Sequence, residues 1–307
     1  MIEPDVSVDP LVTIALPTYR PGAYLWLAVQ SLLNQTMPDF ELLIFDDWGG
    51  DDAIAHIRAI GDPRVKIIDD GVNVGLAARL NQAVAMARGR YFARMDHDDI
   101  AHPERLARQI AFLEERPDVD LLGTGCITIN GDNEITGHLP LAVNHEDICR
   151  HPWLGFYVPH PTWIARLEWF AMHRYSPSAP YFCEDQEMLL RCHQASRYHV
   201  LPDRLLAYRV RSDWSLSKRL KTRFVLMRLQ VAYFSSSKAP GSVIMSLMAC
   251  LARALFDIAA YAGLKRTSKS TLLGGDECDV WSEIVSQASN KLTHTKAEDQ
   301  KAAGNEA

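Results

Sequence analysis

The residues best suited to chemistry lie in the short run 91–99, which reads YFARMDHDD. An apolar stretch ends there in three carboxylates, Asp96, Asp98 and Asp99, around the imidazole of His97. Like charges this close repel one another, so the cluster favours binding of a cation or a donor-rich ligand. Mg²⁺ and Mn²⁺ are typically held by one or two protein carboxylates together with the phosphates of a substrate. The spacing therefore predicts a metal-bridged diphosphate; solvated turn or helix-cap carboxylates are the alternative for an Asp-rich run.

Strands and helices are expected to alternate along residues 11–123. Compact apolar runs predict strands, and apolar residues at helical spacing predict helices. The expected strands are 11–16, 41–45, 65–68 and 91–95, and the expected helices are 25–33, 54–60, 76–88 and 103–115. Gly89 is expected to cap the third of these helices. Such alternation implies a mostly parallel sheet with helices on both faces.

Polar side chains follow each of these four strands. They are Thr18-Tyr19-Arg20, Asp46-Asp47, Asp69-Asp70 with Asn73, and Asp96 to Asp99. Any one of them alone would be an ordinary solvated loop. Because ligands of parallel sheets bind beyond the carboxyl ends of the strands, four polar strand ends in phase predict one shared binding edge.

The chain after residue 121 has a less regular pattern. The expected elements are a hairpin turn at Asn130-Gly131, a helix at 184–194 and strands at 198–201 and 205–210. Residues 144–182 are rich in aromatic side chains and prolines, which suit core packing and, for some of them, a carbohydrate site. Residues 265–307 are polar and lose periodicity toward the end, which predicts a partly disordered tail.

Composition limits the class of protein. A net charge of −6 over 307 residues argues against a nucleic-acid binder, which should be clearly basic. The six cysteines show no CxxC pair, which fits reduced thiols in a cytoplasmic protein better than disulfides or a zinc site. The first ten residues carry acids and prolines, so no secretory signal is expected. The longest uncharged apolar-rich stretch, 239–252, is expected to be too short to span a bilayer.

Several motifs occur together in an order that resembles one known family. They are Pro17-Thr18-Tyr19-Arg20, SLLNQTMPDFELLIFDD at 31–47, NVGLAARLNQAVAMARGRYFARMDHDD at 73–99, HPTW at 160–163 and CEDQEMLLR at 183–191. Over residues 11–210 the chain resembles the family 2 inverting glycosyltransferases of the GT-A fold. The resemblance implies an α/β fold in which a Rossmann-like nucleotide-binding sheet merges with an acceptor-binding half, followed by C-terminal helices. The implied division is a catalytic domain at 1–215 (nucleotide-sugar half 11–125, acceptor half 126–215), helices at 216–264 and the tail 265–307.

The resemblance also implies roles for residues on the nucleotide side. The loop residues Pro17, Thr18, Tyr19 and Arg20 would contact the nucleotide, and Asn73 would shape the loop beside it. Asp47 would hydrogen-bond the base, with a turn cap as its alternative role. Asp96 would face the ribose and the sugar, and Asp98 would bind Mn²⁺ or Mg²⁺ on the diphosphate. Asp99 is expected to cap the following helix.

On the acceptor side, the resemblance implies a catalytic acidic pair. Glu184-Asp185 matches that pair, and Asp185 would be the general base. Acids at a helix N-terminus are also favoured by the macrodipole alone, which is the alternative for both. His160 and Trp163 of the HPTW motif would lie near the sugar or the acceptor; for His160 the alternative is a buried core histidine.

Two residues depart from the family's pattern. Many relatives carry histidine where this chain has Arg211, and an arginine pairs with phosphate but does not ligate a metal. Arg211 is therefore expected on the donor's phosphates, and metal binding by this segment is not. The family's DDGS is DDWG here, so Trp48 replaces a glycine beside Asp47.

The resemblance implies a hexosyltransferase. The donor would be a nucleotide sugar, a UDP-sugar before a GDP- or dTDP-sugar, and the acceptor a glycan or lipid-linked molecule in surface polysaccharide biosynthesis. One alternative is a non-catalytic nucleotide-sugar-binding or partner-binding protein of the same fold. Another is a sugar-nucleotide nucleotidyltransferase, which should carry a glycine-rich loop with Arg and Lys that residues 17–22 do not supply.

Residues 242–262 predict an amphipathic helix. Its polar stripe comprises Ser242, Ser246, Arg253 and Asp257, and apolar side chains cover the rest. A basic cluster lies just upstream at 218–228. Together they predict contact of 216–262 with the cytoplasmic face of a membrane. Packing on the catalytic domain, or pairing with another subunit in a homo-oligomer, is the alternative.

Overall fold

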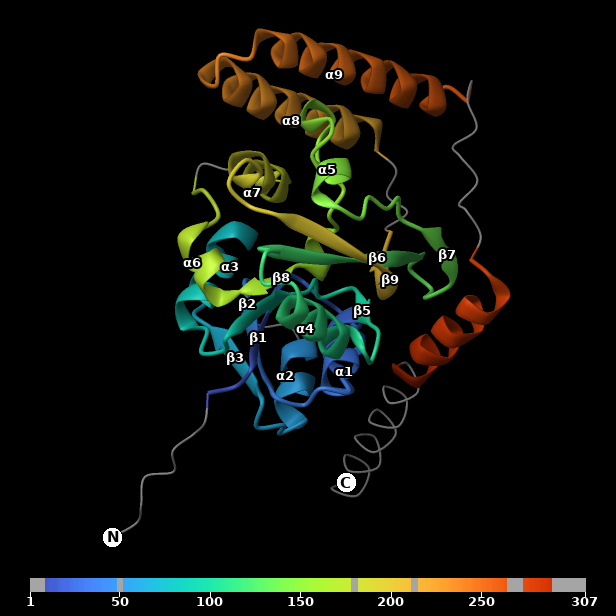
Figure 1. The fold of residues 1–307 in the computed structure, drawn as a ribbon. Coiled ribbons are helices and arrows are strands. Elements are labelled where there is room, and N and C mark those ends of the chain that lie inside the picture. Colours follow the sequence, from blue (N-terminus) through green and yellow to red (C-terminus); the bar gives the residue numbers. More distant parts are fainter. Residues whose placement is uncertain (1–8, 49–51, 178–181, 211–214, 264–272, 289–307) are drawn as a thin grey trace.

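The computed structural model describes residues 9–48, 52–177, 182–210, 215–263 and 273–288. Arg211 and much of the expected tail lie outside these residues. The described residues form one nine-stranded sheet in the order β3-β2-β1-β4-β8-β6-β9-β5, with β7 paired to β6 (Figure 1). The expected fold class is confirmed, because helices cover both faces of a mixed sheet whose first four strands are parallel.

The strands are β1 (Val12–Thr18), β2 (Phe40–Asp46), β3 (Val65–Asp69), β4 (Tyr91–Arg94), β5 (Ile100–Ala101), β6 (Leu121–Ile129), β7 (Ile135–His138), β8 (Ile164–Arg166) and β9 (Tyr198–Arg209). The helices are α1 (Tyr24–Leu33), α2 (Asp52–Ala59), α3 (Leu76–Met86), α4 (Arg105–Glu115), α5 (His145–Ile148), α6 (Leu167–Met172), α7 (Glu184–Cys192), α8 (Leu216–Ser236) and α9 (Pro240–Tyr261), with 3₁₀ turns η1 (Pro152–Leu154) and η2 (His160–Thr162). All four strands and four helices expected before residue 121 are present.

The central strands are apolar on both faces, as a sheet covered by helices requires. Successive side chains of β1 point to opposite sides: Ile14 joins the core under α1, α2 and α4, and Ala15 joins the core under α3, α6 and α7. The same alternation holds in β2 for Ile44 and Phe45. The sheet is therefore held from both sides, which fixes where its strand ends lie.

The expected role of Gly89 as a helix cap is wrong. Helix α3 ends at Met86, and Ala87 is already extended. Gly89 lies against β1, where an added Cβ would come within 2.4 Å of the backbone nitrogen of Thr13. The Gly89 N–H donates to the Thr13 hydroxyl at 2.9 Å. The glycine is therefore required by the close approach of two backbones.

The two strands expected at 198–201 and 205–210 are one strand, β9. It pairs in parallel with β6 along its length, with register irregularities around Gly125. A Cβ on Gly125 would lie 3.1 Å from the carbonyl oxygen of Pro202, so the small residue allows the strands to meet across the irregular stretch. The hairpin at Asn130-Gly131 is confirmed by the antiparallel pair β6–β7.

Part of the expected polar tail is ordered. Residues 275–288 are helical, and the Trp281 indole is 1% exposed and edge-on to His102, with ring centroids 5.5 Å apart. Glu277 pairs with Arg204 at 2.7 Å. Although residues 265–307 are polar overall, the helix at 275–288 carries apolar side chains that pack against the fold. This segment therefore belongs to the folded body.

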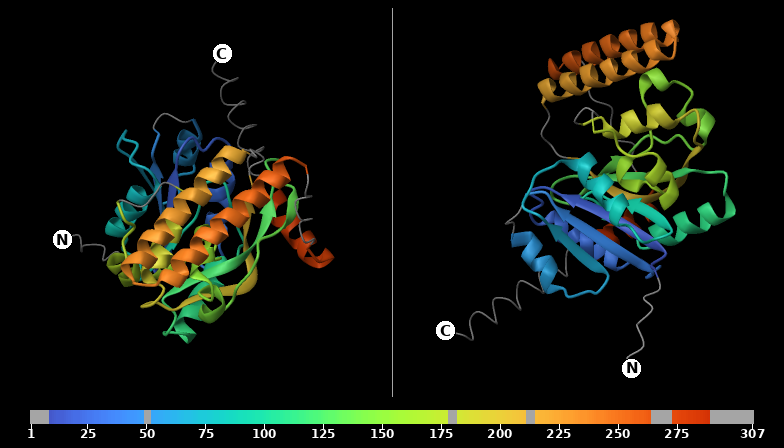
Figure 2. Two further views of the ribbon diagram at one scale, coloured as in Figure 1. Left: turned by 90° about the horizontal axis from the view of Figure 1, so that it is seen from above. Right: turned by 90° about the vertical axis from the view of Figure 1, so that its left-hand side faces the viewer.

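The last long helices form an antiparallel hairpin at the end of the molecule opposite β1–β3 (Figure 1). Seen from above in Figure 2, α8 and α9 lie side by side across the top of the fold. The expectation that the apolar stretch is too short for a bilayer is corrected, because the whole of α9, 22 residues, is long and apolar enough by length and composition to cross one. The uncharged run 239–252 gave too short a length for the apolar helix, since α9 continues through Arg253 and Asp257.

Candidate active site

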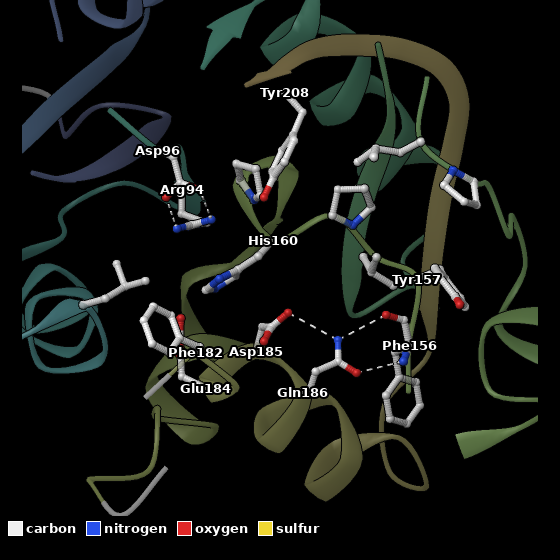
Figure 3. Close-up of a pocket in the computed structure, with 16 residues that line it drawn as sticks. Arg94, Asp96, Phe156, Tyr157, His160, Phe182, Glu184, Asp185, Gln186 and Tyr208 are labelled. Atoms are coloured by element: carbon white, nitrogen blue, oxygen red, sulfur yellow. Dashed lines mark hydrogen bonds and ion pairs between the residues drawn. The ribbon is translucent and has the colours of Figure 1, made fainter. Parts of the chain in front are cut away.

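The strand-end carboxylate Asp96 and the acidic start of α7 face one cavity of about 530 Å³ (Figure 3). The end of β4 supplies Arg94 and Asp96, α7 supplies Glu184 and Asp185, and β9 supplies Tyr208. Two further cavities adjoin it: one of about 470 Å³ toward β1 and β2, and one of about 330 Å³ toward the end of β9. Asp96 lines all three cavities. The binding edge expected from the strand ends therefore continues into the α7 side.

The β1–β2 cavity contains the expected nucleotide-side residues. Its lining includes Pro17, Thr18, Tyr19, Asp47, Asn73 and Asp96. The Asp47 carboxylate accepts from the N–H groups of Val74 and Gly75 at 2.8 and 2.9 Å. It also pairs with the buried Arg79 at 2.8 Å. The carboxylate thus fixes the loop beside it and retains unused acceptor capacity on one oxygen.

Arg79 is a structural residue of this site that the sequence pattern did not reveal. Its guanidinium also pairs with Asp70 at 2.6 Å, and that hydrogen bond lowers the pKa of Asp70 to about 2. Gly75, at φ +82°, gives the loop a backbone conformation that side chains disfavour. Asp47, Arg79 and Asp70 together hold the loop 70–75 against the end of β2.

An exposed cluster of rings stands at the rim of the same cavity. The Trp48 indole is 45% exposed and meets Tyr19 edge-on, with centroids 5.4 Å apart. The Arg20 guanidinium lies 3.7 Å from the centroid of the Trp48 ring. Trp48, the departure from the family's pattern, is therefore joined to the expected nucleotide loop.

The Asp-rich run is fastened to two other elements. The nearly fully buried Arg94 forms an ion pair with Asp96. Asp99 accepts from the N–H of Arg209 at 2.9 Å, and the Arg209 guanidinium donates to the carbonyl of Asp98 at 2.7 Å. Asp99 is therefore not a helix cap as expected, since α4 begins at Arg105 after Glu104. Its true partner is the backbone of β9.

The donor chemistry of this run fits a hard divalent cation. Asp96, Asp98 and Asp99 line the smallest of the three cavities, and their carboxylate oxygens are the ligands that Mg²⁺ and Mn²⁺ prefer. Burial, and after it the charges of Asp96 and Asp98, raises the pKa of Asp99 well above its usual range. Among the described residues no group of three His, Cys, Asp or Glu is arranged to hold a metal alone. Phosphates and water would have to complete the shell.

The acidic pair at the start of α7 has a different environment. Burial raises the pKa of Asp185, and burial with the neighbouring Asp185 charge raises the pKa of Glu184. Gln186 donates to Asp185 at 3.3 Å and to the carbonyl of Phe156 at 3.1 Å, and it accepts from the Phe156 N–H at 2.9 Å (Figure 3). Gln186, which sequence analysis missed, thus ties the expected base to the cavity wall.

His160 and Trp163 of the HPTW motif have different positions. His160 lines the large cavity and forms a 2.7 Å hydrogen bond with the Tyr175 hydroxyl. Burial and the charge of Arg94 hold its pKa well below the usual range, so the imidazole is neutral. Trp163 is fully buried, and its indole N–H donates to the carbonyl of Val158 at 3.1 Å. The expected contact of Trp163 with sugar or acceptor is therefore wrong; it packs edge-on behind His160 at 4.5 Å.

Comparison with known proteins identifies the family. The model of the family described as Glycosyl transferase family 2 matches residues 13–171. The chain is a family 2 glycosyltransferase. A glycosyltransferase of Haemophilus influenzae is 29% identical over 224 residues, which is 68% of this chain and 68% of that protein. The O-antigen biosynthesis glycosyltransferase WbnJ of Escherichia coli is 30% identical over 208 residues, 65% of this chain and 80% of that protein.

Solved structures confirm the GT-A fold of this glycosyltransferase. S. aureus TarS 1–349 in complex with UDP-GlcNAc superposes with a TM-score of 0.62 at 19% identity, covering 90% of this chain and 81% of TarS. The mannosyltransferase PcManGT of Pyrobaculum calidifontis, in complex with GDP-Man and Mn2+, gives a TM-score of 0.57 at 15% identity. The match covers 92% of this chain and 86% of PcManGT.

Proposed function

We propose that this glycosyltransferase moves a hexose from a nucleotide sugar to a glycan or lipid-linked acceptor, with inversion of the anomeric carbon, in surface polysaccharide biosynthesis. The observation that carries the proposal is the position of Asp96 in all three cavities. It connects the nucleotide-side loop, the cation-suited carboxylates and the buried acidic pair. A donor spanning that path would place its sugar between Asp96 and Asp185.

The chain's own residues provide the proton transfer. Asp185 takes the proton of an acceptor hydroxyl while that oxygen attacks the anomeric carbon and the bond to the nucleoside diphosphate breaks. Because burial raises the pKa of Asp185, its carboxylate is a stronger base than an exposed aspartate. Gln186 orients the carboxylate toward the cavity. A single displacement of this kind inverts the configuration.

Asp98 is the residue we assign to Mn²⁺ or Mg²⁺, with the rest of the shell from the donor's phosphates and water. A bound cation supplies charge neutralisation for the departing diphosphate. Arg211, which lies outside the described residues, remains a proposed phosphate partner. Arg94 keeps Asp96 fixed at the junction of the cavities.

A UDP-sugar is the donor we favour. The unused acceptor capacity of Asp47 suits the N–H of a base edge, and Tyr19 lines the same cavity. TarS is described in complex with UDP and UDP-GlcNAc, and PcManGT with GDP-Man, so a GDP-sugar is second. WbnJ is described for O-antigen biosynthesis, and a Bacillus subtilis relative, TuaG, 34% identical over 110 residues, for teichuronic acid biosynthesis. Both descriptions support a role in surface polysaccharide synthesis, which we place in the cytoplasm.

A donor panel tests the proposal. UDP-, GDP- and dTDP-sugars are incubated with the protein and Mn²⁺, Mg²⁺ or EDTA, and release of nucleoside diphosphate is measured. Cation-dependent release of UDP supports the proposal. Donor binding without release would favour the non-catalytic protein. In a parallel incubation with a sugar phosphate and a nucleoside triphosphate, release of pyrophosphate would favour a nucleotidyltransferase.

A further inference from the structure

Helix α9 has its polar side chains turned inward and its apolar side chains turned outward. Its buried residues are Ser246 and Asp257. Asp257 pairs with Arg223 of α8 at 3.1 Å, and Arg253 donates to the carbonyl of Leu154 in η1 at 2.8 Å. The polar stripe expected from the sequence is therefore used against the body of the protein.

The outward face is large and apolar. Nine side chains of α9 are between 41% and 63% exposed: Ile244, Met245, Leu247, Met248, Leu251, Leu255, Phe256, Ile258 and Tyr261. In Figures 1 and 2 this hairpin forms the outer layer of the molecule, away from the sheet. A contiguous exposed patch of this kind marks an interaction surface in a folded protein.

The positive charge of the α8–α9 hairpin indicates what kind of partner its apolar face would contact. Residues 215–263 contain seven Lys or Arg and one acid, whereas the whole chain has a net charge of −6. The single acid is the buried, paired Asp257. Exposed basic side chains of α8 include Lys218, Lys221 and Arg228. An apolar face beside a purely basic surface matches an anionic lipid headgroup layer over acyl chains, whereas two copies of the same basic hairpin would repel one another.

We infer that the outward face of α9 lies in the surface of an anionic membrane, with the basic residues of α8 against the headgroups. The helix lies on the membrane and does not cross it. Crossing would break the contacts of Asp257 with α8 and of Arg253 with η1, and would leave both charges without partners in hydrocarbon.

The hairpin also supports the wall of the active-site cavity. Gln230 of α8 donates to the carbonyl of Pro152 at 3.2 Å, and Arg253 of α9 holds Leu154. Gln186 of α7 holds Phe156 two residues further on. One short segment, 152–156, therefore connects the proposed membrane layer to the proposed general base. This arrangement suits an acceptor carried on a lipid. The inference about the acceptor rests on the proposed function, whereas the inference of membrane binding does not.

Vesicle co-sedimentation of the full chain tests the inference. We expect the protein to pellet with phosphatidylglycerol-containing vesicles, to bind phosphatidylcholine vesicles at least about tenfold less, and to leave the membrane in alkaline carbonate. Leu251→Glu, at a residue 62% exposed on α9, should weaken binding at least about tenfold, while Met172→Glu, at a residue 76% exposed on α6, should not. Lys221→Glu with Arg228→Glu should remove the preference for anionic vesicles.

Several outcomes would overturn the inference. Equal binding to both kinds of vesicle, or to neither, removes the role of the basic face. Unchanged binding of Leu251→Glu removes the role of α9, and resistance to carbonate means that the helix spans. If light scattering shows a dimer that Leu251→Glu dissociates, without vesicle binding, the face belongs to a second copy. Nucleoside diphosphate release in the absence of vesicles reports separately on the proposed function.

Discussion

The active site contains two acidic clusters whose surroundings differ. Asp96, at the end of β4, is paired with the buried Arg94 and belongs to a run fastened to β9 by Arg209. Within the described residues no Lys or Arg forms an ion pair with Glu184 or Asp185, and the pKa of both is raised by burial. A buried guanidinium offsets the charge of Asp96, which suits a cation site beside it, whereas Glu184 and Asp185 have no such ion-pair partner in the described part of the chain and their raised pKa suits the acceptance of a proton. The same residue type thus supports two roles through its environment.

The largest expected effect comes from breaking the first cluster at Asp98. Asp98→Ala should abolish turnover and cation-dependent donor binding, because the cation loses its proposed protein ligand while the fold is retained. Donor affinity with and without Mn²⁺, measured by calorimetry, checks this. Asp203→Ala, at an exposed carboxylate beside another cavity, is the control. Full activity of the Asp98 variant, or of the wild type in EDTA, would show that no cation is bound there.

Breaking the second cluster should affect turnover and not donor binding. Asp185→Asn removes the proposed base and should lower kcat by about 10²–10⁴-fold, the usual range for loss of a general base. The donor dissociation constant should remain nearly unchanged, since the base acts on the acceptor. Glu184→Gln should have the smaller effect on kcat. If Asp185→Asn turns over normally and Glu184→Gln does not, the two roles are reversed.

The pH dependence sharpens the difference between the clusters. A general base works when deprotonated, so activity should fall as the pH drops through the raised pKa of Asp185. The hydrogen bond from Gln186 lowers that pKa, so Gln186→Leu should move the acid limb of the kcat profile to higher pH. A drop in kcat at every pH with an unmoved limb would mean that Gln186 only supports the wall at Phe156.

Local pattern predicted the first half of the molecule well. The strand ends 46–47 and 96–99 could be assigned to one edge because parallel strands deliver their carboxyl ends to the same side. The roles of Arg94 and Gln186 could not be assigned from the sequence, because these roles depend on contacts that form only in the folded protein. Gln186, for example, bonds to Phe156, 30 positions away. A charge at the end of an otherwise apolar strand was the one available signal for Arg94.

Two side-chain orientations could not be read from the sequence, and for the same reason. The HPTW motif gives the residue types but not the direction of their side chains. In the fold, η2 ends after Thr162 and the Trp163 side chain lies in the core. The periodicity of α9 gave its polar stripe without showing that the stripe faces inward. Periodicity divides a helix or a motif into faces, but the choice of the inward face depends on partners such as Leu154 and Arg223.

The smallest expected effect concerns Trp48, on the nucleotide side of the comparison. Its ring is covered by Arg20 and meets Tyr19, both from the proposed nucleotide loop. Trp48→Gly, which restores the family's residue, should weaken donor binding about 2–5-fold, the range of an exposed cation–π contact of ~0.5–1 kcal/mol. Trp48→Phe should retain most of the affinity because a ring remains beneath the guanidinium. The change should appear in KM and not in kcat, opposite to Asp185→Asn. Unchanged or tighter donor binding in Trp48→Gly would place the indole outside the nucleotide pocket. The polar Asp47 and the aromatic Tyr19 would then form the boundary of that pocket.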